Sequence, residues 1–268
     1  MVTVSGGGIT AQLDVADGAR LTSLIAGGRE WLAASGPRTP GRYVQQGSGG
    51  WDDVVPTVTA CVLEDGTILG DHGDAWQTEW TLDSYDEAHV QTSVWLPSLP
   101  IALSKRLQAT ATGLLLTWTA RTEAPGRFPL AWCAHPLFSA DADTRIVVAE
   151  PSTLIEEYPR DRRARDWPEA VGATAIKAFT ETRHSSASVI HANGDSLTLT
   201  WDERLLPYLG LYWDGGEFTS VPVVSIEPST AFGDSTVRAL DEGRVRMLEQ
   251  GFPFRWWVHI QCQGDQAR

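Results

Sequence analysis

The chain has 268 residues, of which 42% are apolar and 12 are tryptophans, and its formal net charge is −13. This composition supplies a large hydrophobic core and excludes disorder for nearly all of the chain. The acidic charge argues against a nucleic-acid partner and favours a neutral or small polar ligand. No linker divides the sequence, so we expect one domain over residues 1–268.

Residues 1–15 contain neither a basic segment nor an apolar segment of the kind that directs export. No later stretch approaches the length of a membrane span. We therefore expect a cytoplasmic protein that has no membrane partner.

Short segments with a period of two occur along the whole chain, which is the pattern of half-buried β-strands. They are residues 9–15, 19–26, 76–85, 89–96, 114–120, 196–202, 207–213, 221–226 and 254–262. Turn signals separate many of them, for example at Asn193-Gly194. Helical periodicity is limited to two short candidates, residues 167–171 and 202–206. The sequence therefore predicts an all-β fold, a large antiparallel sandwich of well over ten strands.

Residues 156–170 interrupt the strand pattern with charges and two prolines. We interpret this segment as a long loop. Three of its four arginines, Arg162, Arg163 and Arg165, form a basic cluster that either extends into solvent or contacts an anionic group of a substrate.

The three cysteines, Cys61, Cys133 and Cys262, lie in apolar or strand-like sequence. The odd number and the absence of a CxxC pair disfavour a disulfide framework and a zinc site. We interpret all three as reduced core residues.

A glycine-rich segment, residues 47–53, carries a tryptophan and two carboxylates in the sequence GSGGWDD. Ordering such a loop costs conformational entropy, so it is interpreted either as a structural turn or as the wall of a ligand pocket.

Three titratable residues occupy junctions between a strand and a loop. Glu227 follows the apolar run VPVVSI and precedes a proline, where desolvation raises a carboxyl pKa and suits a general base. His135 ends the segment LAWCA and also precedes a proline, and an imidazole near a glutamate supplies the acid in proton transfer. His72 lies between acids in the sequence DHGDAW, and these acids favour its protonated form.

Each of these residues also has a structural interpretation, as a solvated glutamate, a hydrogen-bonded core histidine or a turn histidine. Two histidines and a glutamate are further compatible with a 2-His-1-carboxylate metal site. The sequence contains no local HxH or HExxH motif. We therefore expect no metal and no cofactor, and the metal site stays as an alternative.

In their order along the chain, these features resemble the galactose mutarotase-like, or aldose 1-epimerase, superfamily. The resemblance covers nearly the whole length through the segments GARLTSLIAGGREWL, GGWDD, DHGDAWQTEW, AHPLF, YLGLYWDGG, SIEPST and LEQGFPFRWWVHIQ. The family has a first histidine in an HG pair, a second in an H-x-x-F-like strand end and a base glutamate in an EP pair. These match His72, His135 and Glu227.

The resemblance implies a β-supersandwich with an open sugar cleft and the activity of an aldose 1-epimerase, or mutarotase. Such an isomerase interconverts the α and β anomers of a sugar without a cofactor. Glu227 would take the proton from the C1 hydroxyl while His135 protonates the ring oxygen. His72 would hold or polarise the same region of the sugar.

The resemblance also suggests residues that bind the sugar. Trp51 would offer an aromatic face to the pyranose, and Asp52 or Asp53 would accept hydrogen bonds from hydroxyls. Arg42 and Asp214 are the nearest matches to the family's sugar-binding arginine and aspartate.

Two other functions stay open. One is an epimerase of an anionic sugar that carries a phosphate, sulfonate or carboxylate, for which the arginines of residues 156–170 would be the distinguishing feature. The other is a sugar-binding protein without catalysis. In each case the expected partner is a small sugar, and the chain is expected to be a monomer or a homodimer.

Overall fold

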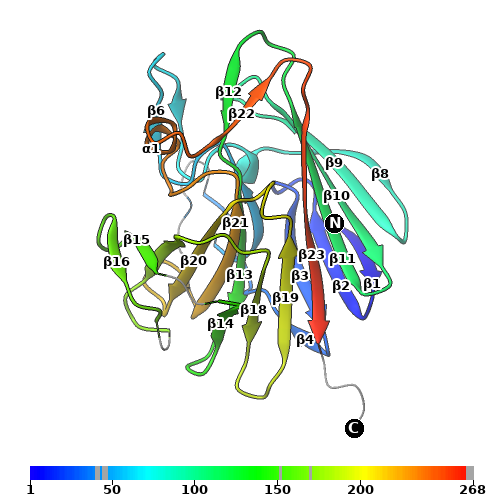
Figure 1. Cartoon of the computed structure of the whole chain (residues 1–268). Helices are drawn as coiled ribbons and strands as arrows, with labels where there is room; N and C mark the ends of the chain where they lie inside the picture. Colours follow the sequence, from blue (N-terminus) through cyan, green and yellow to red (C-terminus); the bar gives the residue numbers. More distant parts are fainter. Residues whose placement is uncertain (40–42, 44–47, 151–152, 169–170, 264–268) are drawn as a thin grey trace.

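The computed structural model describes the whole chain except residues 40–42, 44–47, 151–152, 169–170 and 264–268. The described residues form 23 β-strands, one short α-helix and one 3-10 helix. Two large antiparallel sheets pack against each other (Figure 1). The prediction of an all-β antiparallel sandwich is confirmed.

The larger sheet has eleven strands. In spatial order it contains β1 (Val2–Gly6), β2 (Ile9–Asp14), β3 (Arg20–Ala26), β5 (Gly50–Val54), β13 (Cys133–Ser139), β21 (Val223–Ser229), β20 (Tyr208–Asp214), β17 (Ile176–Thr180), β15 (Leu154–Tyr158) and β16 (Arg163–Arg165), with β4 (Arg29–Glu30) attached to β3.

The second sheet has eight strands. In spatial order it contains β14 (Arg145–Val148), β18 (Ser186–Ile190), β19 (Ser196–Trp201), β23 (Phe254–Gln263), β11 (Gly113–Arg121), β10 (Ala102–Thr110), β9 (His89–Trp95) and β8 (Thr81–Tyr85). The remaining elements are the ribbons β12 (Arg127–Leu130) with β22 (Arg246–Glu249) and β6 (Cys61–Val62) with β7 (Ile68–Leu69), the 3-10 helix Ala75–Gln77 and α1 (Thr236–Asp241).

One large hydrophobic cluster fills the space between the sheets and includes residues from Val4 to Ile260. Burial alternates along strands such as β9 and β11, because one face packs on this core and the other meets solvent. Three indoles, Trp118, Trp132 and Trp256, pack together in it, with Trp132 centred 4.6 Å from Trp118 and 5.2 Å from Trp256.

Three neighbouring strands at the middle of the larger sheet, β5, β13 and β21, are buried on both faces. Ala134 and Phe138 of β13 belong to the core, so the intervening His135 and Leu137 face away from it. Loops cover this outer face. Polar side chains there are thus buried without entering the hydrophobic core.

Two local predictions are wrong. Residues 202–206 form a turn, and in the other helix candidate the described residues 167, 168 and 171 are not helical. The α-helix is instead α1, capped by the Ser235 hydroxyl, which accepts from the backbone N–H of Arg238. Its six residues are too few for a periodic pattern to indicate a helix.

The segment 156–170 is in part a β-hairpin and not a loop, because β15 and β16 pair through it. The pairing brings Glu156 close to Arg165, at 2.9 Å between carboxylate and guanidinium. Charges that interrupt the apolar pattern therefore stabilise a strand pair.

All three cysteines are free, and Cys133 is buried as expected. Cys61 and Cys262 are only partly buried at the edge of the core. Within the ranges that the structure describes, no helix has the length and hydrophobicity needed to cross a membrane.

Candidate active site

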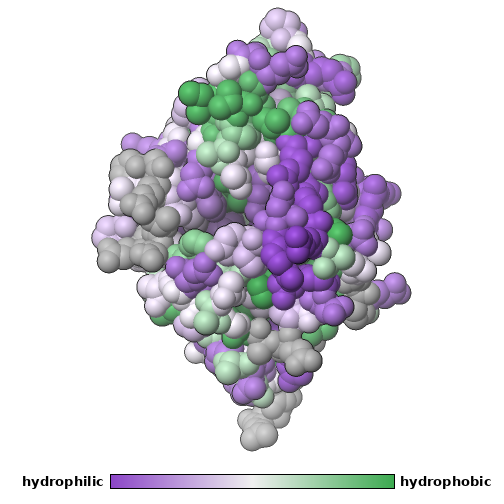
Figure 2. Space-filling view, turned by 90° about the vertical axis from the view of Figure 1, so that its left-hand side faces the viewer, coloured by the Kyte–Doolittle hydropathy of each residue, from purple (hydrophilic) through white to green (hydrophobic). Residues whose placement is uncertain are grey.

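A cavity of about 500 Å³ opens on the outer face of the larger sheet. Side chains from β13, β15, β17, β20 and β21 line it, together with loops that surround them. Figure 2 views the molecule from the side on which β15, β16 and α1 lie. The volume falls in the range of about 300–1,000 Å³ that is typical of small-molecule sites.

The structure brings the three residues predicted as catalytic into this cavity. His72, His135 and Glu227 all line it. Nε2 of His135 lies 3.9 Å from Oε1 of Glu227, and the two imidazole rings are 5.3 Å apart between centroids. Their catalytic roles are still a prediction at this point.

His135 and Glu227 approach each other because their strands pair directly. β13 and β21 are antiparallel neighbours, with Cys133 opposite Ser229 and Phe138 opposite Val224. This register places both side chains on the same face of adjacent strands.

Glu227 is fully buried and is held as a carboxylate. Lys177 from β17 forms an ion pair with Oε2, and the Cys133 thiol donates to the same oxygen at 3.4 Å. Burial alone would raise the pKa of Glu227, but Lys177 and His135 outweigh it and hold this pKa below its ordinary value. In the described part of the chain, Oε1 has no hydrogen-bond partner. The site therefore contains a charged oxygen that is available to accept a proton.

Lys177 is one of only two lysines in the sequence, and it is buried. Its Nζ also lies 3.7 Å from Oδ1 of Asp234. Burial would lower the pKa of Lys177, but the carboxylates of Glu227 and Asp234 outweigh it and raise this pKa above its ordinary value. Lys177 therefore stays positively charged at physiological pH, and its side chain lines the cavity.

His135 is neutral at physiological pH. Burial lowers its pKa to about 3, although the Glu227 carboxylate acts in the opposite direction. Its Nδ1 lies 3.1 Å from the hydroxyl of Tyr43, and the two rings meet edge to face.

His72 is positioned by an unusual backbone turn. Its φ is 57° and that of Gly73 is 71°. A Cβ on Gly73 would come within 2.1 Å of the Val55 carbonyl oxygen, so only glycine fits there. The His72 ring stacks on Tyr43 at 4.0 Å between centroids, and its Nδ1 bonds to Asp71 at 2.9 Å.

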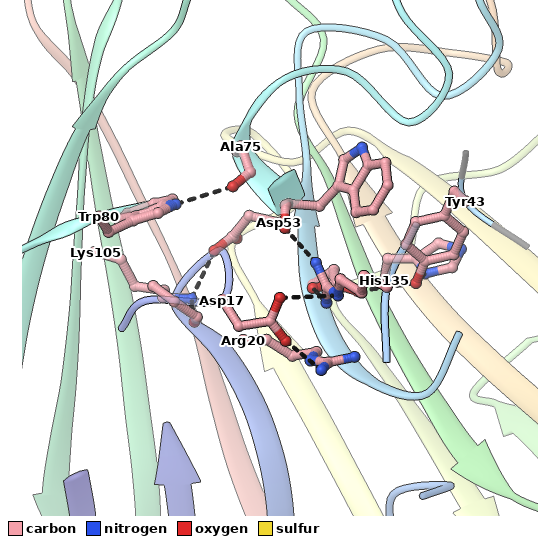
Figure 3. A network of polar contacts seen from close by, with 12 residues as sticks. Asp17, Arg20, Tyr43, Asp53, Ala75, Trp80, Lys105 and His135 are labelled. Atoms are coloured by element: carbon pink, nitrogen blue, oxygen red, sulfur yellow. Dashed lines mark hydrogen bonds and ion pairs between the residues drawn. The ribbon is translucent and has the colours of Figure 1, made fainter. Parts of the chain in front are cut away.

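Trp51 and Asp53 do not line the cavity, so direct contact with a sugar is not supported for either. Trp51 is 1% exposed and packs edge-on against Phe138 in the core. Asp53 points into the sandwich, where its carboxylate binds Lys105 at 2.7 Å and the Trp132 indole N–H at 2.9 Å. Alternation along β5 puts both side chains on the face opposite to Asp52, and Figure 3 shows Asp53 directed toward Lys105.

Asp52 and Asp214 support the walls of the cavity without lining it. Asp52 is fully buried, pairs with Arg38 and accepts a 2.9 Å hydrogen bond from the Tyr43 hydroxyl. Asp214 is also fully buried and accepts from four backbone N–H groups of residues 216–219. Their oxygens are occupied within the protein, so neither is a sugar ligand in this geometry. Arg42 lies outside the described residues.

Several residues of the cavity were not anticipated from the sequence. Lys177 sits in the apolar segment AIKAF, and a lysine at such a position is a signal of a buried charge. Tyr43 and Asp234 themselves lie outside strands and helices, and no sequence pattern indicated them.

The arginines of residues 156–170 point elsewhere. Arg162 binds Glu157 at 2.8 Å, Arg165 binds Glu156, and Arg163 is exposed. None of these three lines the cavity. Among the described residues, Arg238 lines the cavity, and it binds Asp161 at 2.6 Å.

Among the residues with described positions, no group of three or more His, Cys, Asp and Glu side chains could hold a metal ion. Some of the potential ligand atoms are engaged by protein partners, whereas Glu227 Oε1 has no hydrogen-bond partner among the described residues. Lys177 occupies Glu227 Oε2, Tyr43 lies on His135 Nδ1, and Asp71 lies on His72 Nδ1.

No protein-family model matches the chain, and no curated protein matches it significantly. Solved structures do match. A galactose mutarotase-like protein from Lactobacillus casei is 16% identical with a TM-score of 0.77, over 98% of this chain and 100% of that chain. A candidate aldose 1-epimerase from Escherichia coli is 14% identical with a TM-score of 0.76, over 97% and 98% of the two chains.

A galactose mutarotase related enzyme from Lactobacillus acidophilus is 13% identical with a TM-score of 0.76, and the similarity covers 100% of this chain and 99% of that chain. The chain therefore has the fold of the galactose mutarotase-like superfamily. The resemblance noted in the sequence is confirmed at the level of the fold.

Proposed function

We propose that the chain is an aldose 1-epimerase that interconverts the anomers of a neutral aldose. One observation carries this proposal: the unpartnered Oε1 of Glu227 lies 3.9 Å from Nε2 of His135 in a sugar-sized cavity. Mutarotation removes a proton from O1 and adds one to the ring oxygen. Both oxygens are bonded to C1, so the base and the acid must lie close together.

In the proposed reaction, Glu227 Oε1 accepts the proton of the C1 hydroxyl. The electron pair of that O–H bond forms the carbonyl, the bond from C1 to the ring oxygen breaks, and His135 Nε2 gives its proton to the ring oxygen. Rotation about C1–C2 presents the other carbonyl face. The same two residues then reverse their roles, each step contributing about 10²–10⁴ in rate.

The proposed acid must carry a second proton in the reacting form. Burial lowers the pKa of His135 to about 3, so Nε2 takes up this proton before it can protonate the ring oxygen. His72, whose ring centroid lies 4.0 Å from that of Tyr43 and 5.3 Å from that of His135, is suited to hold the sugar at the ring-oxygen end.

A neutral substrate fits the charges of the cavity. Its described lining includes five carboxylates and two cations: Asp71, Glu157, Asp161, Glu227, Asp234, Lys177 and Arg238. Both cations are already paired with carboxylates. An anionic sugar would meet net repulsion from these walls and from the acidic chain as a whole.

The test is anomer-exchange NMR on a panel of neutral aldoses, with the spontaneous rate in the same buffer subtracted. Glu227→Gln should retain sugar binding and lose catalysed exchange, because an amide cannot accept the hydroxyl proton. Glu203→Gln, at an exposed turn, is the matched control and should behave as wild type. Wild-type exchange that survives in Glu227→Gln would remove Glu227 as the base. Sugar binding without exchange in the wild type would instead indicate a sugar-binding protein.

A further inference from the structure

A chain of part-buried hydrogen bonds leads away from Nδ1 of His135, while Nε2 is the ring nitrogen near Glu227. Nδ1 of His135 meets the Tyr43 hydroxyl at 3.1 Å, and this hydroxyl lies 2.9 Å from Oδ2 of Asp52. Oδ1 of Asp52 is paired with the guanidinium of Arg38. The chain links strand β5 to strand β13, on which Asp52 and His135 are directly opposite each other.

The positions of the protons in this chain follow from the donors and acceptors available. Arg38 is a donor only, and the Tyr43 hydroxyl donates to Asp52, so both carboxylate oxygens of Asp52 act as acceptors. Burial raises the pKa of Tyr43 well above its ordinary value, and Asp52 acts in the same direction, so the phenol keeps its single proton. That proton goes to Asp52. The Tyr43 oxygen can then only accept from His135, which must carry a proton on Nδ1.

We infer that Asp52 and Tyr43 are positioning residues that fix the tautomer of His135, so that Nδ1 always carries a proton and only Nε2 exchanges protons at the cavity. When His135 is neutral, the lone pair of Nε2 faces Glu227 and the cavity. When His135 takes up a second proton, that proton resides on Nε2.

This arrangement has the logic of a catalytic triad, in which a buried carboxylate holds an imidazole in the reactive tautomer. Here a phenol stands between the carboxylate and the imidazole. The catalytic consequence rests on the proposed function, because it concerns the proton that His135 delivers to the sugar. The tautomer itself does not depend on that function.

The test is ¹⁵N NMR of the imidazoles of the full chain at neutral pH, without sugar. His135→Gln identifies the His135 signals by their loss. We expect a protonated Nδ1 and an unprotonated Nε2 in the wild type. A wild-type His135 that is protonated on Nε2 alone would overturn the inference, whatever the activity of the protein.

Asp52→Asn gives a sharper result, because Arg38 can accept nothing and therefore holds the amide oxygen. The amide N–H₂ must then donate to the Tyr43 oxygen, which frees the phenol proton to donate to Nδ1. We expect the proton of neutral His135 to move to Nε2. A folded Asp52→Asn variant that keeps its proton on Nδ1 would contradict the proposed chain.

Tyr43→Phe provides a second variant that leaves the buried Arg38–Asp52 pair intact. It removes the acceptor of Nδ1, so the fixed tautomer should be lost. In anomer exchange, kcat should fall about tenfold or more, equivalent to about 1.4 kcal/mol, with KM nearly unchanged. Tyr85→Phe, on the other sheet, is the matched control and should keep both the spectrum and kcat. An unchanged tautomer in Tyr43→Phe, or an unchanged kcat with an altered tautomer, would overturn the positioning role.

Discussion

Asp53 and Lys105 form an ion pair of 2.7 Å that joins the two large sheets through the middle of the sandwich. Asp53 is on β5, directly beside the strand that carries His135, and Lys105 is on β10 of the other sheet (Figure 3). Both side chains are almost completely buried. Their pairing fixes the position of β5 from the core side of the strand. Asp52, on the opposite face of the same strand, is directed toward the cavity.

Lys105→Met should therefore destabilise the protein strongly, because it leaves the Asp53 carboxylate buried without its counter-charge. Breaking one side of such a pair costs about 3–5 kcal/mol. Replacing both partners, with Lys105→Met and Asp53→Leu, should cost less than the single change. Urea unfolding followed by tryptophan fluorescence measures the effect. Arg127→Met, which breaks an exposed pair with Glu249, is the control and should change stability little.

The pH dependence of catalysis should show the low basicity of His135. Its pKa in the free protein is about 3, so the doubly protonated ring is a minor form at neutral pH. The pKa of Glu227 is below its ordinary value, so this base stays ionised in the same range. Because kcat/KM reports the free enzyme, it should rise about tenfold per unit as the pH falls from about 8 to about 5.

Anomer exchange over this pH range, corrected for the spontaneous reaction, measures the slope. His135→Asn should lose it. A flat profile in the wild type would contradict the assignment of His135 as the acid and would transfer the donor role to Lys177, which is charged at every pH in the range.

Much of the sandwich could be predicted from the sequence, because alternating strands are recognisable by their period. His135 and Glu227 are indicated as titratable residues followed by proline, but the expectation that each proline ends its strand is wrong, since β13 continues to Ser139 and β21 to Ser229. Their catalytic roles, like that of His72, stay predictions. His135 and Glu227 are far apart in the sequence, so no local pattern indicates that they are close in space. The resemblance to a known family led to that expectation.

The orientation of the segment GWDDV could not be predicted. β5 is buried on both faces, so its sequence has no polar face that would indicate which side chains reach the cavity. The side chains of Trp51 and Asp53 face the core and that of Asp52 faces the site. Trp51 therefore does not offer the aromatic face to a sugar that the sequence suggested. Ion pairs between residues far apart in the sequence determine the orientation of these side chains, such as Asp53 with Lys105 and Asp52 with Arg38.

Lys177 should act mainly by keeping Glu227 ionised. Lys177→Met leaves the buried carboxylate without its cation, and burial then raises its pKa. We expect kcat/KM to fall by about tenfold or more near pH 5 and by a smaller factor near pH 8, where the carboxylate is again ionised. Lys177→Arg, which keeps the charge, should restore part of the loss near pH 5.

Arg183→Met, which removes an exposed cation, is the control for net charge and should leave the profile unchanged. A loss of the same size at both pH values in Lys177→Met would contradict an effect through the charge of Glu227. It would indicate instead that the ammonium group contacts the sugar directly.

The final prediction concerns Arg162, Arg163 and Arg165, the basic cluster that would recognise an anionic sugar. Arg162 forms an ion pair with Glu157, and Arg165 forms one with Glu156. Arg163 is exposed and does not line the cavity. An arginine that is already paired with a carboxylate adds little attraction for a phosphate. Replacing all three with glutamine should therefore change kcat/KM equally for a neutral aldose and for its 6-phosphate.

The two substrates are compared by anomer-exchange NMR at one ionic strength, because screening changes any anionic contribution. Thermal unfolding of the triple variant checks that losing the pairs with Glu156 and Glu157 leaves the fold intact, and Arg163→Gln alone serves as a variant in which these pairs are kept. A loss of tenfold or more confined to the 6-phosphate, equivalent to about 1.4 kcal/mol of transition-state binding, would reverse the assignment of a neutral substrate. An equal, small effect on both sugars is expected, because these arginines stabilise the β15–β16 hairpin and do not line the cavity.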